Sequence, residues 1–220
     1  MAKLAVNGGQ KLITRSLGKQ WSIWDEREEK AVLDGLHTGR WWGGGEESKV
    51  REFEDAFSAY QNVQYSITTP SGTQALICAL AATGVEPGDE ILVPALSFFA
   101  SATCALFLNA IPVFVDADPS YNQSAEVLEA AITGRTPAAV IVHNGGYPAD
   151  MDAIMAVSRR HDLSIIEDFA HAQGSEWKGT RVGAIGHLDT FSLMGGEGGI
   201  ILSNNVELRE KLYTYMAMGR

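Results

Sequence analysis

The sequence has few of the features that mark secreted, membrane-spanning or nucleic-acid-binding proteins. Its two cysteines, Cys78 and Cys104, lie in apolar runs without metal-ligand spacing, so we expect buried thiols and neither a disulfide nor a metal site. No apolar run approaches the length of a membrane span, and the first ten residues lack the apolar core of a signal peptide. The net charge of −10 argues against a nucleic-acid surface. We therefore expect a cytoplasmic protein without a membrane or nucleic-acid partner.

The sequence does contain a regular alternation of short apolar strands and helices. We expect short strands at 64–68, 90–94, 112–116, 138–142 and 163–168. Their residues are mostly apolar and often β-branched, as in strands that are buried on both faces. Helices are expected between them, at 72–82, 99–109, 124–133 and 151–161. This alternation predicts an α/β domain whose mostly parallel sheet carries helices on both faces.

Other elements are expected on either side of this alternation. Two helices come first, at 25–40 and 47–60, and the former begins with a capping box formed by Asp25 and Glu28. In the last part of the chain we expect a hairpin at 176–183, strands at 188–192 and 199–203, and a helix at 206–218. The fold expected is a mixed, mostly parallel sheet flanked by helices.

Ligands of open α/β sheets bind beyond the carboxyl ends of the strands, so the residues that follow each strand are candidates. Ser71, Gly72 and Thr73 begin a helix, where free N–H groups and the helix dipole favour an anion such as phosphate. Capping by Ser71 or Thr73 is an equally good interpretation. For Phe98 and Phe99, core packing is the favoured interpretation from the residues alone, and the alternative is that one of them lies flat on an aromatic ligand.

Asp168 closes an apolar strand at the same edge. A buried carboxylate is costly unless a protonated ring nitrogen, a metal or a base pairs with it, so a functional role is favoured over a helix cap. His143 also follows a strand and could line this edge, whereas His37, His161 and His187 are expected to be solvated or capping. No G-x-G-x-x-G motif follows a strand, which argues against a dinucleotide enzyme.

Several segments together resemble the DegT/DnrJ/StrS family of sugar aminotransferases, which use pyridoxal phosphate (PLP) and have the fold type I, or aspartate-aminotransferase-like, architecture. The matching segments are TGRWWGG, SGTQAL, GDEILVPALSFFASA, PVFVDADP, YPADMDAI, IIEDFAHAQGSEWKGTRVG and GEGG, in the order and spacing of the family. The resemblance implies that residues 1–220, with the N-terminal helices to residue 60, form the cofactor-binding large domain, and that the small C-terminal domain of the family is absent.

The resemblance implies how the chain would hold the phosphate and one face of the cofactor ring. Gly72 and Thr73 match the residues that hold the cofactor phosphate, and Ser192 matches a serine that also reaches it. Phe98 matches the aromatic residue that stacks on the pyridine ring. The phosphate part of this assignment agrees with the helix-terminus argument.

The resemblance also implies roles around the ring nitrogen and hydroxyl. Asp168 matches the aspartate that pairs with the pyridinium nitrogen, which lets the ring absorb electrons released from the substrate. Ala170 would pack beneath the ring. His171 stands where the family usually has a glutamine near the ring hydroxyl, so a donor whose charge varies with pH replaces a neutral one.

The chain departs from the family between Ser192 and Glu197. The family pattern has ten residues between these positions, including the lysine that forms the Schiff base with PLP and shuttles protons. Here only Leu193 to Gly196 separate the two, and none of the seven lysines of the chain stands at that place. No catalytic residue can therefore be assigned, although seven cofactor-binding residues can.

The function implied by the resemblance is amino transfer from glutamate or glutamine to a keto sugar, nucleotide-linked, or to a keto-cyclitol. The cofactor would be PLP or its amine form, pyridoxamine phosphate (PMP), and the family implies a homodimer. One alternative is an inactive relative that keeps the fold without the lysine. Another is a lysine-less, PMP-dependent sugar dehydratase, although such enzymes place a histidine where this chain has none between Ser192 and Glu197.

Overall fold

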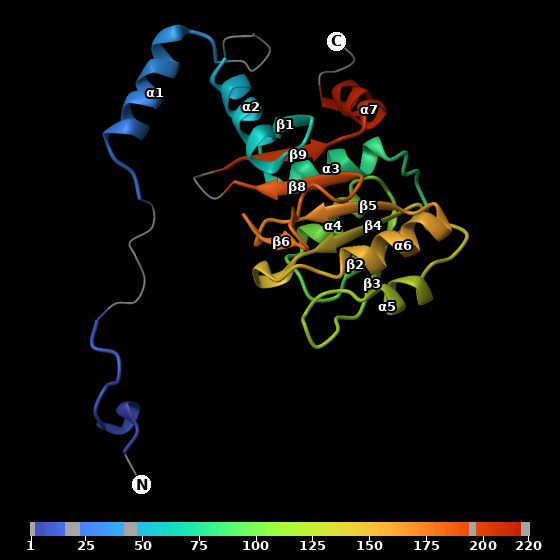
Figure 1. The fold of residues 1–220 in the computed structure, drawn as a ribbon, viewed down its shortest axis with the longest axis horizontal. Helices are drawn as coiled ribbons and strands as arrows, with labels where there is room; N and C mark the ends of the chain where they lie inside the picture. Colours follow the sequence, from blue (N-terminus) through green and yellow to red (C-terminus); the bar gives the residue numbers. More distant parts are fainter. Residues whose placement is uncertain (1–2, 16–22, 42–47, 194–196, 217–220) are drawn as a thin grey trace. The chain divides into compact units, whose positions relative to one another are not determined.

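The structure, a computed structural model, describes residues 3–15, 23–41, 48–193 and 197–216 (Figure 1). The chain forms two compact units, Met1–Trp41 and Trp42–Arg220. That both belong to one cofactor-binding domain stays a prediction. No helix of the described residues is both long and apolar enough to cross a membrane.

The first unit contains a short 3-10 turn, Ala5–Asn7, and the helix α1 (Glu26–Thr38). The predicted capping box is present at the start of α1. The Asp25 carboxylate accepts a hydrogen bond from the Arg27 N–H, and the Glu28 carboxylate accepts one from the Asp25 N–H. Both bonds satisfy donors that the first turn leaves free, which fixes where the helix begins.

The second unit is built on a seven-stranded sheet with the order β1-β9-β8-β5-β4-β2-β3. Its strands are β1 (Tyr65–Thr69), β2 (Glu90–Pro94), β3 (Ile111–Val115), β4 (Ala138–Val142), β5 (Ser164–Asp168), β8 (Leu188–Ser192) and β9 (Gly199–Ser203). β9 runs antiparallel to β1 and β8, and the other pairs are parallel. The predicted mixed, mostly parallel sheet is confirmed, and six strands present their carboxyl ends at one edge.

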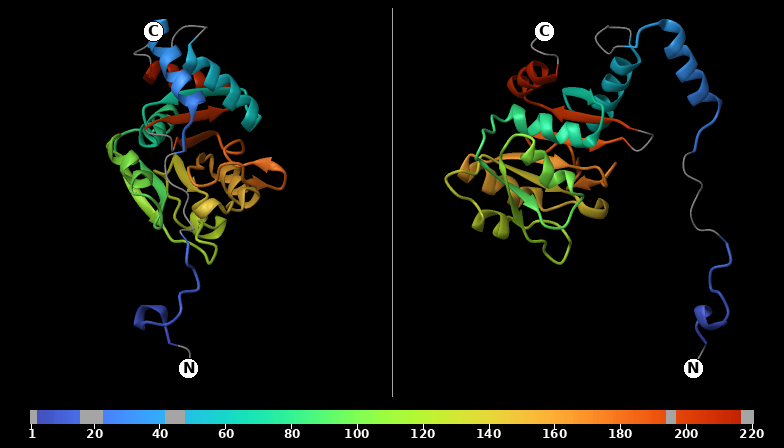
Figure 2. Two further views of the ribbon diagram at one scale, coloured as in Figure 1. Left: turned by 90° about the vertical axis from the view of Figure 1, so that its left-hand side faces the viewer. Right: turned by 180° about the vertical axis from the view of Figure 1, so that it is seen from behind.

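Helices cover both faces of this sheet, as predicted (Figures 1 and 2). They are α2 (Lys49–Gln61), α3 (Gly72–Ala82), α4 (Ala100–Leu106), α5 (Ala125–Ala130), α6 (Met151–His161) and α7 (Val206–Met216). The buried clusters place α3, α4 and α7 on one face and α2, α5 and α6 on the other. A short hairpin of β6 (Glu176–Trp177) and β7 (Thr180–Arg181) follows β5, and a 3-10 turn, Asn144–Gly146, follows β4.

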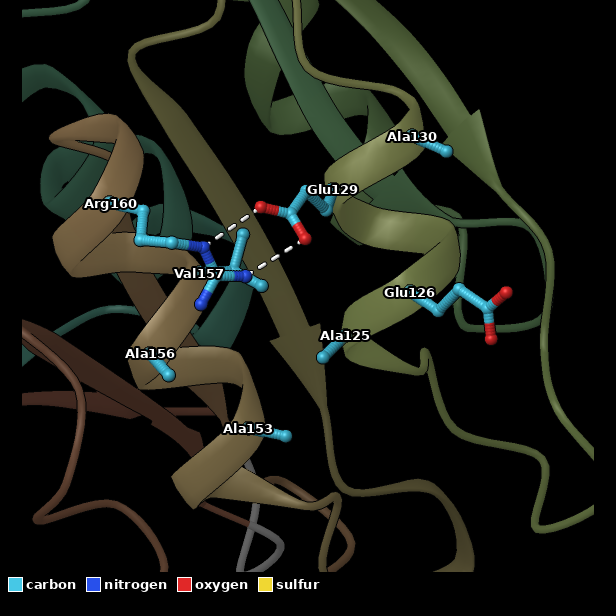
Figure 3. A pocket seen from close by; sticks show the side chains of 8 residues that line it. All are labelled: Ala125, Glu126, Glu129, Ala130, Ala153, Ala156, Val157 and Arg160. Atoms are coloured by element: carbon cyan, nitrogen blue, oxygen red, sulfur yellow. Dashed lines mark hydrogen bonds and ion pairs between the residues drawn. The ribbon is translucent and has the colours of Figure 1, made fainter.

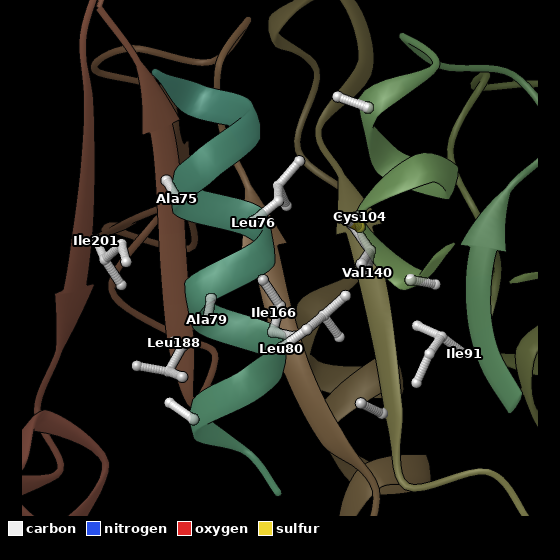
Figure 4. Close-up of a cluster of buried hydrophobic side chains, with 14 of the residues drawn as sticks. Ala75, Leu76, Ala79, Leu80, Ile91, Cys104, Val140, Ile166, Leu188 and Ile201 are labelled. Atoms are coloured by element: carbon white, nitrogen blue, oxygen red, sulfur yellow. The ribbon is translucent and has the colours of Figure 1, made fainter. Parts of the chain in front are cut away.

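The helix α3 anchors the face that carries the site. The Leu80 side chain of α3 packs in one buried cluster with Val140 and Ile166 of the sheet and with Cys104 of α4 (Figure 4). Such burial stabilises the fold by about 1.5–3 kcal/mol for each large aliphatic side chain. Both cysteines are free; Cys104 is fully buried, and burial raises the pKa of its thiol to about 12. Because this core fixes α3 against the sheet, the start of α3 is held at the edge where the strands end.

Three expectations about the elements need correction. β3 is not buried on both faces, because it is the outermost strand and its Phe114 side chain is 63% exposed. α4 ends at Leu106, short of residue 109, because the chain turns back through Asn109 in the left-handed region with φ of 56°. α5 likewise ends at Ala130, three residues early, and residues 217–218 of the last expected helix lie outside the described residues.

Candidate active site

A cavity of about 360 Å³ opens at the carboxyl ends of β4, β5 and β8, beside the first residues of α3 and α4. Its volume falls in the range of small-molecule sites. Seven of its lining residues are those that the sequence singles out: Gly72, Thr73, Phe98, Asp168, Ala170, His171 and Ser192. The structure thus brings together residues that lie up to 120 positions apart, while their roles stay predictions.

The start of α3 forms the wall of the cavity suited to an anion. Ser71 caps the helix, since its hydroxyl accepts a hydrogen bond from the Gln74 N–H at 3.2 Å. Among the described residues, none accepts a hydrogen bond from the N–H groups of Gly72 and Thr73. The capping and the anion-binding interpretations are therefore compatible, because the cap uses one donor and leaves two facing the cavity.

Gly72 also allows α3 and β8 to approach closely. A Cβ atom at Gly72 would lie 2.6 Å from the Cβ of Ser192, which is closer than two carbon atoms can pack. The two predicted phosphate-binding positions, at the ends of different elements, are therefore in direct contact. A side chain at position 72 would fill the space in which a phosphate could meet both.

Replacing Gly72 by alanine is expected to push α3 away from Ser192. We expect a loss of about 1–3 kcal/mol in the free energy of unfolding, as for other overpacked sites, measured by urea denaturation. Gly134→Ala is the matched control, because nothing lies within 4 Å of a Cβ there, and its effect should stay within about 0.5 kcal/mol. Equal effects of the two substitutions would contradict the close contact.

Asp168 is a buried acid whose charge is only partly compensated. Its residue is 9% exposed, and Oδ1 accepts a hydrogen bond from the Ala170 N–H at 3.1 Å. No helix begins after it, so the helix-cap alternative is wrong. Among the described residues no donor reaches Oδ2. Burial raises the pKa of Asp168, and the Ala170 N–H and the nearby His171 and His143 offset only part of this. A cation in the cavity would satisfy the carboxylate.

Other lining residues follow from strand alternation, although sequence reasoning passed over them. Val142 and Thr190 flank Asp168 on the two neighbouring strands, and both face the cavity with it. Counting two residues back from Ser192 would have found Thr190, and Val142 is the last residue of an expected strand. Glu197, which is exposed, also lines the cavity; it belongs to the GEGG segment, for which the sequence suggested no role at the site.

Two histidine expectations are wrong. His143 does not line the cavity; it is fully buried and bonded to Glu167 and the Ala149 N–H. His187 is not solvated, because its half-buried ring accepts a hydrogen bond from the Ile165 N–H at 2.9 Å. Both rings are polar partners within the packed sheet rather than groups open to a ligand.

The strands that flank the missing lysine segment remain paired. Ser192 pairs with Gly199, and the Leu193 N–H donates to the Gly198 carbonyl at 2.9 Å; residues 194–196 lie outside the described residues. No lysine stands among the described residues that line the cavity. Lys178, in the β6–β7 turn, forms an ion pair with Asp152. The short connection thus keeps the sheet intact but supplies no amine.

A second, shallower hollow lies between α5 and α6 (Figure 3). It is lined mainly by alanines, and the Arg160 guanidinium at its edge already forms two hydrogen bonds to the Glu129 carboxylate, at 3.0 and 2.8 Å. It contains none of the seven predicted residues. Among the described residues, no group of three or more His, Cys, Asp or Glu side chains could hold a metal ion. The cavity at the strand ends is therefore the candidate active site.

A mostly parallel sheet with this cavity at its carboxyl edge is the large-domain architecture of PLP-dependent aminotransferases. The structure of 3-amino-5-hydroxybenzoic acid synthase superposes with a TM-score of 0.87 at 36% identity, over 92% of this chain and 55% of that one. Residues 23–220 match the DegT/DnrJ/EryC1/StrS aminotransferase family, and the chain belongs to it.

Relatives within the family act on cyclitols and sugars. The chain is 40% identical to L-glutamine:2-deoxy-scyllo-inosose aminotransferase of Streptomyces fradiae, over all of this chain and 54% of the relative. It is 41% identical to GDP-perosamine synthase of Caulobacter vibrioides, over 89% of this chain and 54% of the relative. The chain thus spans about half the length of these relatives. The first match runs over 234 residues, against 220 in this chain, so the relative has residues where this chain has none.

Proposed function

We propose that this chain is the cofactor-binding part of an aminotransferase that moves an amino group from glutamine or glutamate to a keto-cyclitol or a keto sugar. The observation that carries the proposal is the cavity in which a buried, partly uncompensated Asp168 faces the free helix start at Gly72 and Thr73. The named activities of the relatives supply the donor and the class of acceptor.

PLP or PMP fits this cavity, and each end of it would bind a different part of the cofactor. When bound, the cofactor supplies a conjugated pyridinium ring that takes up electrons from the substrate carbon. The N–H groups of Gly72 and Thr73 and the hydroxyl of Ser192 would bind the phosphate through hydrogen bonds and the helix dipole. The phosphate would thereby orient the rest of the cofactor toward Asp168.

The other end of the cavity would hold and orient the ring. Asp168 would keep the proton on the ring nitrogen, since an ionised carboxylate stabilises a nearby cation. Phe98 and Ala170 would exclude water from the two ring faces, and His171 would lie near the ring hydroxyl. The exposed Phe98 ring would lose its contact with water by stacking on the cofactor.

We also propose that the protein is a homodimer in the cytoplasm. In support of the dimer, large apolar side chains are exposed at the C-terminal end of α4 and on the edge strand β3, which are in contact. They are Leu106, Phe107, Ile111 and Phe114. Two further exposed rings, Phe98 and Phe99, stand at the start of α4 with centroids 4.2 Å apart. A patch of this kind marks an interaction surface. A second copy of the chain is the partner that the family suggests.

The proposed function is tested by supplying the amine that the cavity lacks. PMP should bind saturably to the purified chain, with inorganic phosphate as a competitor. With 2-deoxy-scyllo-inosose added, mass spectrometry should detect the aminated cyclitol, and a small primary amine such as methylamine should accelerate its formation by taking over proton transfer. Absence of PMP binding, or of product with the amine present, would refute the proposal.

A further inference from the structure

A buried polar cluster lies behind the candidate site, on the opposite face of the sheet. It consists of Glu167, His143 and Asp189, whose exposed fractions are 0%, 0% and 1%. Glu167 directly precedes Asp168 in β5, and successive strand residues point to opposite faces. The cluster therefore cannot touch a ligand in the cavity, and the proposed function uses none of its side chains.

Among the described residues, four hydrogen bonds hold the Glu167 carboxylate. Oε2 accepts from Nε2 of His143 at 2.8 Å and from the Gly183 N–H at 3.0 Å. Oε1 accepts from the N–H groups of Ile185 and Gly186, at 2.7 and 2.5 Å. Burial alone would raise the pKa of Glu167, but the hydrogen bond to His143 and the electrostatic attraction of that residue, helped by the Gly183 N–H, outweigh it and lower the pKa to about 2. Glu167 is therefore a carboxylate anchored to the loop before β8.

His143 connects this anchor to Asp168. Its Nδ1 accepts a hydrogen bond from the Ala149 N–H at 3.1 Å, so the ring proton is on Nε2 and points at Glu167. The backbone N–H of His143 donates to the backbone carbonyl of Asp168 at 3.2 Å. One residue thus holds the side chain of Glu167 and the main chain of Asp168.

Asp189 completes the cluster from the neighbouring strand. It pairs with Glu167 in the β5–β8 register, so the two acids lie side by side on one face. Burial and the adjacent negative charge of Glu167 raise the pKa of Asp189 well above its usual range. Its Oδ1 has no partner among the described residues. Asp189 is therefore the neutral acid of the pair, and Glu167 keeps the charge.

We infer that Glu167 and His143 are positioning residues, which lock the carboxyl end of β5 so that Asp168 is aimed at the ring nitrogen of the cofactor. The inference rests on the proposed function, because it requires a cofactor at Asp168. Within the described part of the chain, the Asp168 side chain makes only one hydrogen bond, so the direction of this side chain depends on its backbone. Stability alone is a weak reason for such a cluster, since apolar side chains of the same volume avoid the cost of burying a charge.

Glu167→Gln tests the inference, with Asp189→Asn as the matched control. Glutamine keeps the shape but presents an NH₂ group to backbone donors, so the anchor loosens. Asparagine imitates a neutral Asp189 and leaves the anchor in place. We expect Glu167→Gln to weaken PMP binding about tenfold and to lower the pKa of the bound ring nitrogen by about one unit, which is the same free energy. Asp189→Asn should change the affinity less than twofold.

The readouts are PMP titration, the pH dependence of the absorbance of bound PMP, and urea unfolding. A merely structural role would lower stability and leave the ring pKa in place. If wild type binds PMP and Glu167→Gln binds it with equal affinity and equal ring pKa, the inference is overturned while the proposed function stands. If wild type does not bind PMP, the proposed function fails, and the inference fails with it.

His143→Asn serves where Glu167→Gln does not fold. The asparagine Oδ1 can replace Nδ1 as the acceptor for the Ala149 N–H, but the shorter side chain has no donor that reaches Glu167. A shift of the ring pKa in the same direction as that expected for Glu167→Gln supports the inference. An unchanged ring pKa in a folded His143→Asn protein overturns it.

Discussion

No cofactor is expected to become covalently fixed in the cavity when the purified chain is mixed with PLP and treated with borohydride. Borohydride fixes PLP only where a lysine amine has bonded to its aldehyde, and the described lining of the cavity contains no lysine. The seven lysines of the chain are Lys3, Lys11, Lys19, Lys30, Lys49, Lys178 and Lys211. None falls between Ser192 and Glu197, where the family places the catalytic lysine.

Intact mass and peptide mapping after reduction measure this outcome. Lysines on the surface react slowly and without competition from PMP, so only labelling that PMP prevents reports on the cavity. If each chain gained one label and PMP prevented that labelling, the prediction would be contradicted. The catalytic amine would then belong to one of the seven lysines of the chain. Lys178 is the one to map first, because it lies in the β6–β7 turn of the hairpin that follows β5.

Glu197→Lys is the matched positive variant. Glu197 lines the cavity and is exposed, so a lysine there can reach into the space without burying a charge. We expect this variant to gain a label at position 197 that PMP prevents, whereas wild type gains none. The contrast isolates the amine from the rest of the site, because every other lining residue is unchanged.

The sheet could be predicted from the sequence because its strands are short, apolar and separated by helices. The approximate strand bounds and the convergence of residues at the strand ends follow from that pattern. The exposure of β3 could not be predicted, since an edge position depends on strand order and not on the composition of residues 111–115. The placement of β9 between β1 and β8 likewise depends on pairing between segments far apart in the chain.

Those parts of the candidate site whose chemistry depends on one residue and its neighbours in the sequence could be predicted. The free helix start at Gly72 and the acid at Asp168 are local features of this kind. The environment of Glu167 is not, because its donors come from His143, 24 residues earlier, and from the backbone of residues 183–186. The sequence shows only a charged residue in an apolar strand. The departure at the lysine segment was visible only against the family pattern.

Asp168→Asn is expected to weaken PMP binding while making the unliganded protein more stable at pH values above the raised pKa of Asp168. Asparagine cannot pair with a protonated ring nitrogen, and removing one partner of a buried charge pair costs about 2–5 kcal/mol, or about thirtyfold or more in Kd. Titration of PMP into both proteins measures this loss. Asp116→Asn is the control, because this exposed acid follows β3 at the same edge of the sheet, and it should not change the affinity.

The stability effect of Asp168→Asn follows from the direction of the pKa shift. Burial raises the pKa of Asp168 in the folded protein, so folding favours the protonated acid. That contribution is fully present below the pKa of the unfolded chain and is lost as pH rises through the higher folded pKa. Asparagine never ionises, so the stability of the variant relative to wild type should rise with pH through this window and then level off, as measured by urea unfolding at several pH values.

Bound PMP should make wild type the more stable of the two proteins. The ring cation of PMP lowers the pKa of Asp168 in wild type, whereas it has no charged partner in the variant. A constant difference across pH would contradict the buried-acid account.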